Sequence, residues 1–226
     1  MDMVSNLLTG IATWGIPLIL ALTLHEACHG LVANMLGDPT AKLQGRLTLN
    51  PIKHIDPMGT ILLPLMLLIM GGFLFGYAKP VPVVARNFKN PRRDMIWVAL
   101  AGPGANILLA IIGILLFPIL NIVPELMTEF LQENLQNLIF INCLLATLNM
   151  LPLPPLDGGR VICGLLPLRA SQKYNRIEPY GIFILVGVIF ILPMLGNVLG
   201  LNINLGGFLI MEPAQYVAQF LVSIFG

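Results

Sequence analysis

Long uncharged intervals separated by short polar connections dominate the chain. The first runs from Leu7 to Leu36 around a short polar cluster, and four more follow: Thr60–Ala78, Met95–Leu120, Asn134–Leu156 and Pro179–Met211. Each is close to or longer than the roughly 20 residues that a helix needs to cross a bilayer. Because Gly and Asn residues interrupt the last interval, we expect one helix to end near Gly200 and another apolar stretch to follow it.

This pattern predicts an all-α polytopic membrane protein with about five to six transmembrane helices, in a single domain over residues 1–226. We expect helices at about 7–36, 95–120, 137–156 and 179–200, and a C-terminal apolar segment at 205–226 that either spans the bilayer or lies in its interface. The connections between these segments are too short to build a hydrophobic core of their own.

Composition supports the membrane assignment and narrows the function. Hydrophobic residues make up 57% of the chain, charged residues 10%, and the mean hydropathy is +0.86. The net charge of +1 leaves no basic domain for nucleic acid. The three cysteines are few, odd in number and widely spaced, so neither a disulfide framework nor a Cys-based zinc ribbon is expected.

The charges predict an orientation and one irregular segment. All twelve Lys and Arg residues lie in three connections, whereas Asn121–Gln136 carries three Glu and no base. The positive-inside rule then places these three connections in the cytoplasm. Residues 60–78 join two of them, so we expect this segment to re-enter the membrane, with breaks at Pro64 and Gly71-Gly72. The alternative is an ordinary crossing with one loop outside.

The most specific chemical motif is His25-Glu26-Ala27-Cys28-His29 within the first helix. At 100° per residue the two His side chains stand about 40° apart around the helix, so both can reach one tetrahedral metal ion. Glu26 beside them can accept the proton of a water molecule. A carboxylate inside a membrane helix costs about 2.5–3.5 kcal/mol on insertion scales, which favours a functional site over a structural contact.

A catalytic zinc ion usually has three protein ligands, so a third must come from elsewhere in the chain. Asp157 is the first candidate, because it closes a proline-rich run that blocks a regular helix and precedes Gly158-Gly159. His54, in a polar loop, is the alternative, although a histidine there commonly bonds to its own loop or faces solvent.

These residues carry a resemblance to a known family. His25-Glu26-x-x-His29, Ala101-Gly102-Pro103-Gly104-Ala105-Asn106, and the stretch from Asn149-x-x-Pro152 to Asp157-Gly158 resemble the motifs of the site-2 proteases, in the family's order. The resemblance covers most of the chain and is closest to compact prokaryotic members without PDZ or CBS domains.

The resemblance implies a zinc-dependent intramembrane endopeptidase that cuts transmembrane protein substrates, in the manner of regulated intramembrane proteolysis. It implies one Zn²⁺ per chain held by His25, His29 and Asp157, with Glu26 as the base and Asn149 at the substrate. Asn106 would support the site or contact substrate. A short β-loop would lie at about 42–57, with a strand at Gln44–Asn50, and the site would face the cytoplasm of a prokaryotic cell membrane.

Two other functions compete with this interpretation. A membrane metal transporter or metal sensor could also place two His and an acid in the bilayer, but a transport path favours several stacked ligand sets, and the sequence offers one. A catalytically silent binding protein would have lost a ligand or the base, and none is replaced here.

Overall fold

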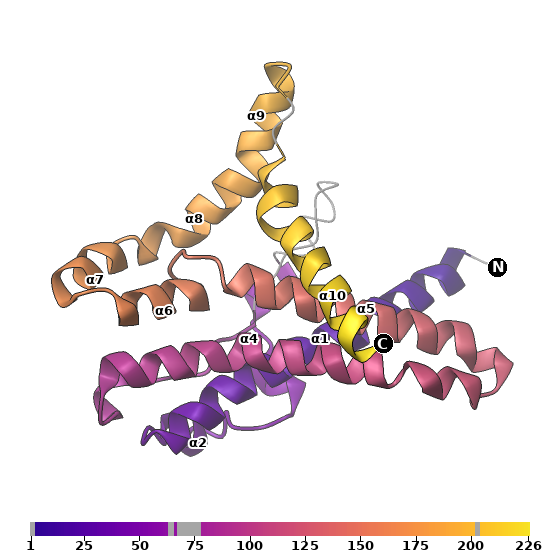
Figure 1. Cartoon of the computed structure of the whole chain (residues 1–226), viewed down its shortest axis with the longest axis horizontal. Coiled ribbons are helices and arrows are strands. Elements are labelled where there is room, and N and C mark those ends of the chain that lie inside the picture. The colour runs from indigo at the N-terminus through magenta and orange to yellow at the C-terminus, as the bar shows by residue number, and fades with distance from the viewer. Residues whose placement is uncertain (1–2, 63–65, 67–77, 202–203) are drawn as a thin grey trace.

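Three long helices form the centre of the molecule. The computed structural model describes residues 3–62, 66, 78–201 and 204–226. Helices α1 (Met3–Met35), α4 (Pro91–Leu115) and α5 (Glu125–Asn149) each pack against the other two. α1 and α5 run in one direction and α4 runs in the other (Figure 1). Small buried residues on α1 and α4, including Ala21, Ala33 and Ala99, allow the two backbones to approach closely.

Helix α5 carries more polar side chains than its neighbours, and two of its amides face inward. The Asn137 Nδ2 donates to the Thr13 carbonyl on α1 at 2.9 Å, and Asn142 is fully buried. Inward-facing amides join helices in a bilayer, where water cannot satisfy them. The helix begins at Glu125, earlier than expected, and ends at Asn149, because the prolines that follow cannot continue it.

The remaining helices lie outside this centre. α6 (Asp157–Leu165) packs against α4 and α7 (Leu168–Asn175), and α8 (Gly181–Val186) continues through a π-turn (Gly187–Ile191) into α9 (Leu192–Val198). α8 and α9 extend away from the central helices, and α10 (Glu212–Phe225) returns onto α4 and α5 (Figure 1). Short helical turns complete the described chain: α2 (Thr40–Leu43), Pro51–His54, Pro57–Leu62, Ala85–Asn87, Phe117–Asn121, Glu178–Tyr180 and Gly207–Met211.

Four helical segments are long and apolar enough to cross a membrane: Leu8–Met35, Pro91–Asn121, Leu168–Val198 and Gly207–Phe225. The 25 residues of α5 extend about 38 Å at 1.5 Å per residue, which also matches the bilayer. The prediction of an all-α integral membrane protein is therefore confirmed.

The expected strand at Gln44–Asn50 is wrong. Residues 47–49 form bends, and the Asn50 N–H donates to the Thr48 hydroxyl at 3.1 Å. This local bond turns the backbone back on itself, and among the described residues no strand lies alongside to form a ladder. The expected re-entry of residues 60–78, with its breaks at Pro64 and Gly71-Gly72, falls largely outside the described residues.

Candidate active site

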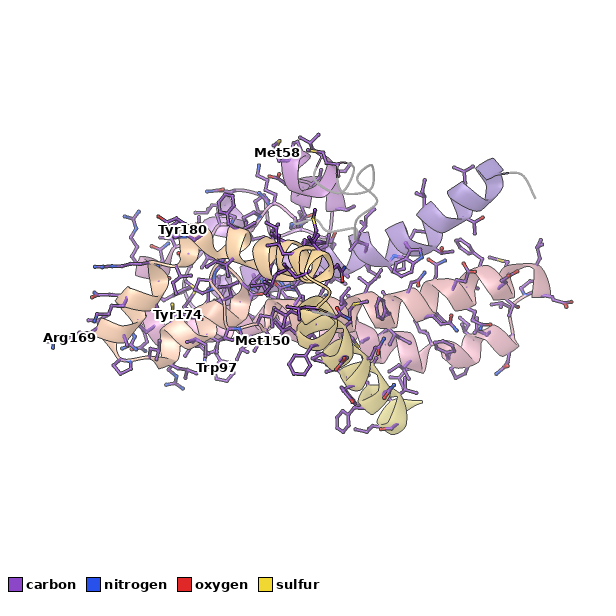
Figure 2. The ribbon with its side chains drawn as sticks, turned by 90° about the horizontal axis from the view of Figure 1, so that it is seen from above. Met58, Trp97, Met150, Arg169, Tyr174 and Tyr180 are labelled. Carbon is purple, nitrogen blue, oxygen red and sulfur yellow. The ribbon has the colours of Figure 1, made fainter. Side chains whose placement is uncertain are left out.

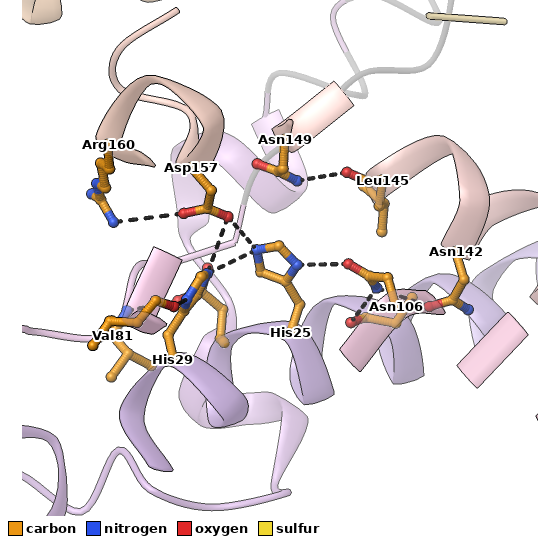
Figure 3. Close-up of polar contacts among 12 residues, drawn as sticks. His25, His29, Val81, Asn106, Asn142, Leu145, Asn149, Asp157 and Arg160 are labelled. Carbon is orange, nitrogen blue, oxygen red and sulfur yellow. Dashed lines mark hydrogen bonds and ion pairs between the residues drawn. The ribbon is translucent and has the colours of Figure 1, made fainter. Parts of the chain in front are cut away.

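Two helices bring together three side chains of the kinds that can bind a metal ion. His25 Nε2 and His29 Nε2 lie 3.0 Å apart, and each is 3.2 Å from Asp157 Oδ2 (Figure 3). All three side chains are more than nine-tenths buried. The described residues hold no other such group of three His, Cys, Asp or Glu side chains.

The two histidines stand one helical turn apart on the side of α1 that faces α4. Gly102 of α4 makes room for their rings, because a Cβ at this position would come within 2.6 Å of His25 Nε2 and closer still to His29 Nε2. The segment that contains Gly102 therefore borders both imidazoles.

Asp157 reaches the histidines from the start of α6. The chain between α5 and α6 folds tightly beneath this helix: a Cβ on Gly158 would lie 2.5 Å from the Leu151 carbonyl oxygen. The Tyr174 hydroxyl on α7 donates to the Pro152 carbonyl at 2.6 Å and holds the same connection from the other side. Close backbone packing, possible only with glycine, thus sets the position of the carboxylate.

A buried chain of amides determines which nitrogen of His25 carries a proton. Asn142 Nδ2 donates to the Leu138 carbonyl at 2.8 Å, so its Oδ1 faces Asn106 and accepts from Asn106 Nδ2 at 2.8 Å. The Asn106 amide nitrogen also donates to the Ala21 carbonyl at 3.3 Å. Asn106 Oδ1 must then accept from His25 Nδ1, 2.6 Å away, because carbonyls cannot donate. This leaves the lone pair of His25 on Nε2.

His29 is oriented in the same way by a backbone group. Its Nδ1 donates to the Val98 carbonyl at 2.7 Å, which leaves the lone pair on Nε2. Histidines that bind metals are commonly held through their other nitrogen by such acceptors.

The cluster therefore consists of three acceptors that face one another. Asp157 Oδ2 is buried and receives no hydrogen bond. Acceptors 3.0–3.2 Å apart repel unless a cation lies among them. Tetrahedral zinc with bonds of about 2.0–2.1 Å would place its ligand atoms about 3.3 Å from one another. The residues present thus suit a divalent cation such as zinc in both chemistry and spacing.

Glu26 is held beside the histidines by a segment far away in the sequence. Its Oε2 accepts from the Val81 N–H at 2.7 Å, and its side chain is partly buried. The segment that carries Val81 is itself attached at several points. Arg46 donates to the Lys79 carbonyl at 2.8 Å, and the Val84 N–H donates to Asp38 Oδ2 at 2.6 Å.

Asp38 anchors this segment after the end of α1. It is fully buried and accepts hydrogen bonds from Thr40, Val84 and Asn87. Burial acts to raise the pKa of Asp38, but these hydrogen bonds outweigh it and lower the pKa below its usual value. The carboxylate therefore stays charged and keeps the segment in place near neutral pH.

The other predicted residues occupy different positions. Asn149 lies next to Asp157 and His25, with its Nδ2 donating to the Leu145 carbonyl at 3.0 Å (Figure 3). Asn106 contacts His25 directly. His54 does not join the cluster: it is buried elsewhere, with its Nε2 2.9 Å from the Thr48 carbonyl oxygen. The alternative third ligand thus bonds within its own loop.

Sequence reasoning missed Asn142 and the Val98 carbonyl. A signal for Asn142 was present, because an amide within an apolar helical run is costly to bury without a partner. No sequence signal identifies a backbone carbonyl such as that of Val98.

Comparisons with known proteins find one matching family and several relatives of the chain. The profile of peptidase family M50 matches residues 118–193. A candidate zinc metalloprotease of Bacillus subtilis, YwhC, is 44% identical over 195 residues, which cover 84% of this chain and 85% of the relative. The protein named Rip2, also a candidate zinc metalloprotease, is 30% identical in Mycolicibacterium smegmatis over 83% of this chain and 68% of the relative. No solved structure gave a significant match.

Proposed function

Since the chain belongs to peptidase family M50, the site-2 protease family, and is a zinc metalloendopeptidase, we propose that it cuts peptide bonds in or near the transmembrane segments of other membrane proteins. The observation that carries this proposal is the group of three inward-facing acceptors, His25, His29 and Asp157, buried between helices of membrane length. Because these substrates are membrane proteins cut in or near their transmembrane segments, we also propose a role in regulated intramembrane proteolysis.

We assign the three acceptors as the ligands of one zinc ion per chain. Zinc supplies a Lewis acid that polarises the peptide carbonyl and makes water easier to deprotonate. Glu26, held by the Val81 N–H, takes the proton from the attacking water and returns it to the leaving amine. The Asn149 amide has two N–H donors and gives one to Leu145, so the second can bind the substrate carbonyl.

A cleavage assay in lipid tests the proposal. The purified full chain, loaded with zinc, should cut a synthetic transmembrane peptide reconstituted in the same vesicles, and a chelator should stop the reaction. Cleavage that continues at the same rate after the zinc has been removed would contradict the metal-dependent mechanism. Absence of cleavage of every transmembrane peptide, with hydrolysis of soluble peptides intact, would contradict the substrate class.

The metal transporter alternative receives no support from the structure. Transport across a bilayer would need successive ligand groups, and the part of the chain that the structure describes holds one. The relatives are also named as zinc metalloproteases.

Replacing Asn142 by Leu should weaken zinc binding about 10–100-fold, the usual effect of losing an outer contact of a metal ligand. Without the Asn142 Oδ1, the Asn106 amide can turn, and His25 Nδ1 loses its fixed acceptor. Zinc affinity is measured by competition with a chelating dye. Asn134→Leu, on the same helix but bonded only to its own turn, is the matched control. Equal zinc affinity in Asn142→Leu and the wild type would contradict the role.

The active site should lie toward the cytoplasmic face of a prokaryotic cell membrane. Basic residues gather at the end formed by the start of α4 with α6 and α7, where Figure 2 places Arg169 and Tyr174. Glu125 and Glu129 lie at the opposite end of α5. The positive-inside rule favours the basic end in the cytoplasm, and His29 is near that end of α1.

Cysteine labelling tests this orientation. In a chain without its native cysteines, Lys173→Cys should react only from the cytoplasm and Glu129→Cys only from the opposite side. The reverse labelling would invert the proposed orientation.

A further inference from the structure

A cleft of about 400 Å³ opens beside the candidate active site, toward the basic end of the molecule. Its walls come from the segment at 81–85, the start of α4, α6, α7 and Glu178. This volume lies within the roughly 300–1,000 Å³ of typical ligand pockets. None of the roles assigned above to the zinc ligands, the base or Asn149 uses this space.

Two residues of the cleft wall connect it to the reacting groups. Val81 lines the cleft and donates its backbone N–H to Glu26 at 2.7 Å. Arg160 also lines it, and its guanidinium lies 3.9 Å from Asp157 Oδ1, the carboxylate oxygen that faces away from the histidines. At its inner end the cleft therefore contacts Val81, which bonds the base Glu26, and Arg160, which lies beside the proposed metal ligand Asp157.

Contacts between α4 and α6 form one side of the cleft. Arg92 at the start of α4 donates to the Leu166 carbonyl and, at 3.2 Å, to the Gly164 carbonyl at the end of α6. Gly164 has no room for a side chain, since a Cβ would lie 2.8 Å from Ile96 Cδ1 and 2.9 Å from the Arg92 carbonyl oxygen. α4 and α6 are therefore joined closely on this side of the cleft.

The lining of the cleft is mixed in chemistry. Val81, Val83 and Met95 give the cleft apolar side chains, and Arg160 and Ser171 on α6 and α7 give it donors, together with the Asn175 amide, which also donates to Glu178. An extended peptide matches this mixed lining, because its side chains alternate in direction and its carbonyls need donors. A lipid chain would leave the polar groups without partners.

We propose that this cleft binds the extended segment of the substrate that leads from the scissile bond toward the basic end of the protein. The inference rests on the proposed function. A peptide bond within a helix is shielded by the helical hydrogen bonds, so a substrate must be extended where it is cut and for some residues beyond. The cleft gives that extended stretch a place outside the lipid, where its backbone groups meet protein donors.

Cys163 offers a direct test because it lines the cleft and is partly buried. A bulky methanethiosulfonate reagent, applied at mildly alkaline pH since burial raises the pKa of this thiol, would fill the cleft through a reversible disulfide. The chain should lack Cys28 and Cys143, so that only Cys163 reacts. A parallel chain with Cys163→Ser and Thr128→Cys, a partly buried position at the far end of α5, is the matched control.

Modification of Cys163 should reduce cleavage of the transmembrane peptide at least about tenfold, corresponding to about 1.4 kcal/mol. Bound zinc should stay unchanged, reduction of the disulfide should restore the rate, and the substrate peptide should slow the modification. Modification of Thr128→Cys should leave the ratio of treated to untreated rates near one. These results would support the cleft as the path of the substrate.

Two failures are distinguishable. If the untreated chain cuts no transmembrane peptide, the proposed function itself fails. If the untreated chain cuts the peptide and full modification of Cys163 leaves the rate unchanged, only the cleft proposal is overturned. A modified chain that loses zinc, or stays inactive after reduction, would point to disruption of the fold. It would also contradict the explanation that the modification lowers cleavage by blocking the cleft.

Discussion

Replacing Glu26 by Gln is expected to lower peptide cleavage by about 10²–10⁴-fold and to leave zinc bound, since this is the usual contribution of a general base. The Gln side chain has nearly the same shape, and its carbonyl oxygen can still accept the hydrogen bond from the Val81 N–H. It cannot take a proton from water at neutral pH. The loss therefore concerns the chemical step and leaves the metal ligands in place.

The measurement combines metal analysis with single-turnover cleavage of a transmembrane peptide in vesicles. Glu129→Gln, at the exposed start of α5, removes the same charge far from the site and should behave as the wild type. A Glu26→Gln protein that works within about threefold of the wild type would remove Glu26 from the mechanism.

The sequence predicted the class of fold from one simple property. A chain this apolar must place its helices in lipid, and the intervals without charge predict where. Helix α5 shows where this reasoning is weak. The helix was expected from about residue 137, but it begins at Glu125, because Glu125, Glu129 and Glu133 in its first turns are exposed and do not prevent a helix. Hydropathy counts polar residues without knowing which direction they face.

The ligand group could be anticipated because its parts are local. The spacing of His25 and His29 is a property of one helix, and the prolines before Asp157 mark a break that frees a carboxylate. The structure brings these three side chains together, and their roles as zinc ligands stay predictions. Asn142 could not be assigned to His25, because the link passes through Asn106 on another helix.

The expected strand at Gln44–Asn50 failed for a related reason. Alternation of Leu47, Thr48 and Leu49 suits a strand, but a strand also needs a partner, and short sequences do not reveal one. The Thr48 hydroxyl instead bonds the nearby Asn50 N–H and closes a local turn. The backbone that bonds Glu26 is found further on, at Val81.

Replacing Asp157 by Ala is expected to weaken zinc binding by more than about 100-fold, beyond the 10–100-fold typical of outer contacts. The substitution removes one of the three proposed ligands and, among the described residues, the one negative charge within 4 Å of the two histidine Nε2 atoms. Two neutral imidazoles would then hold a divalent cation without a counter-charge in a buried site. Asp157→Asn should lie between Ala and the wild type, since the amide keeps one oxygen ligand and loses the charge.

Zinc content and affinity of the purified variants test this prediction, with the metal-free wild type as the reference for folding. The helical signal of Asp157→Ala should equal that of the metal-free wild type, because Gly158 of α6 still packs against the Met150 and Leu151 backbone before that helix. The decisive variant combines His29→Ala with Asp157→Ala. If this double variant still bound one zinc per chain, the metal would have to lie elsewhere, and the convergence of three acceptors between α1 and α6 would need another cation to explain it.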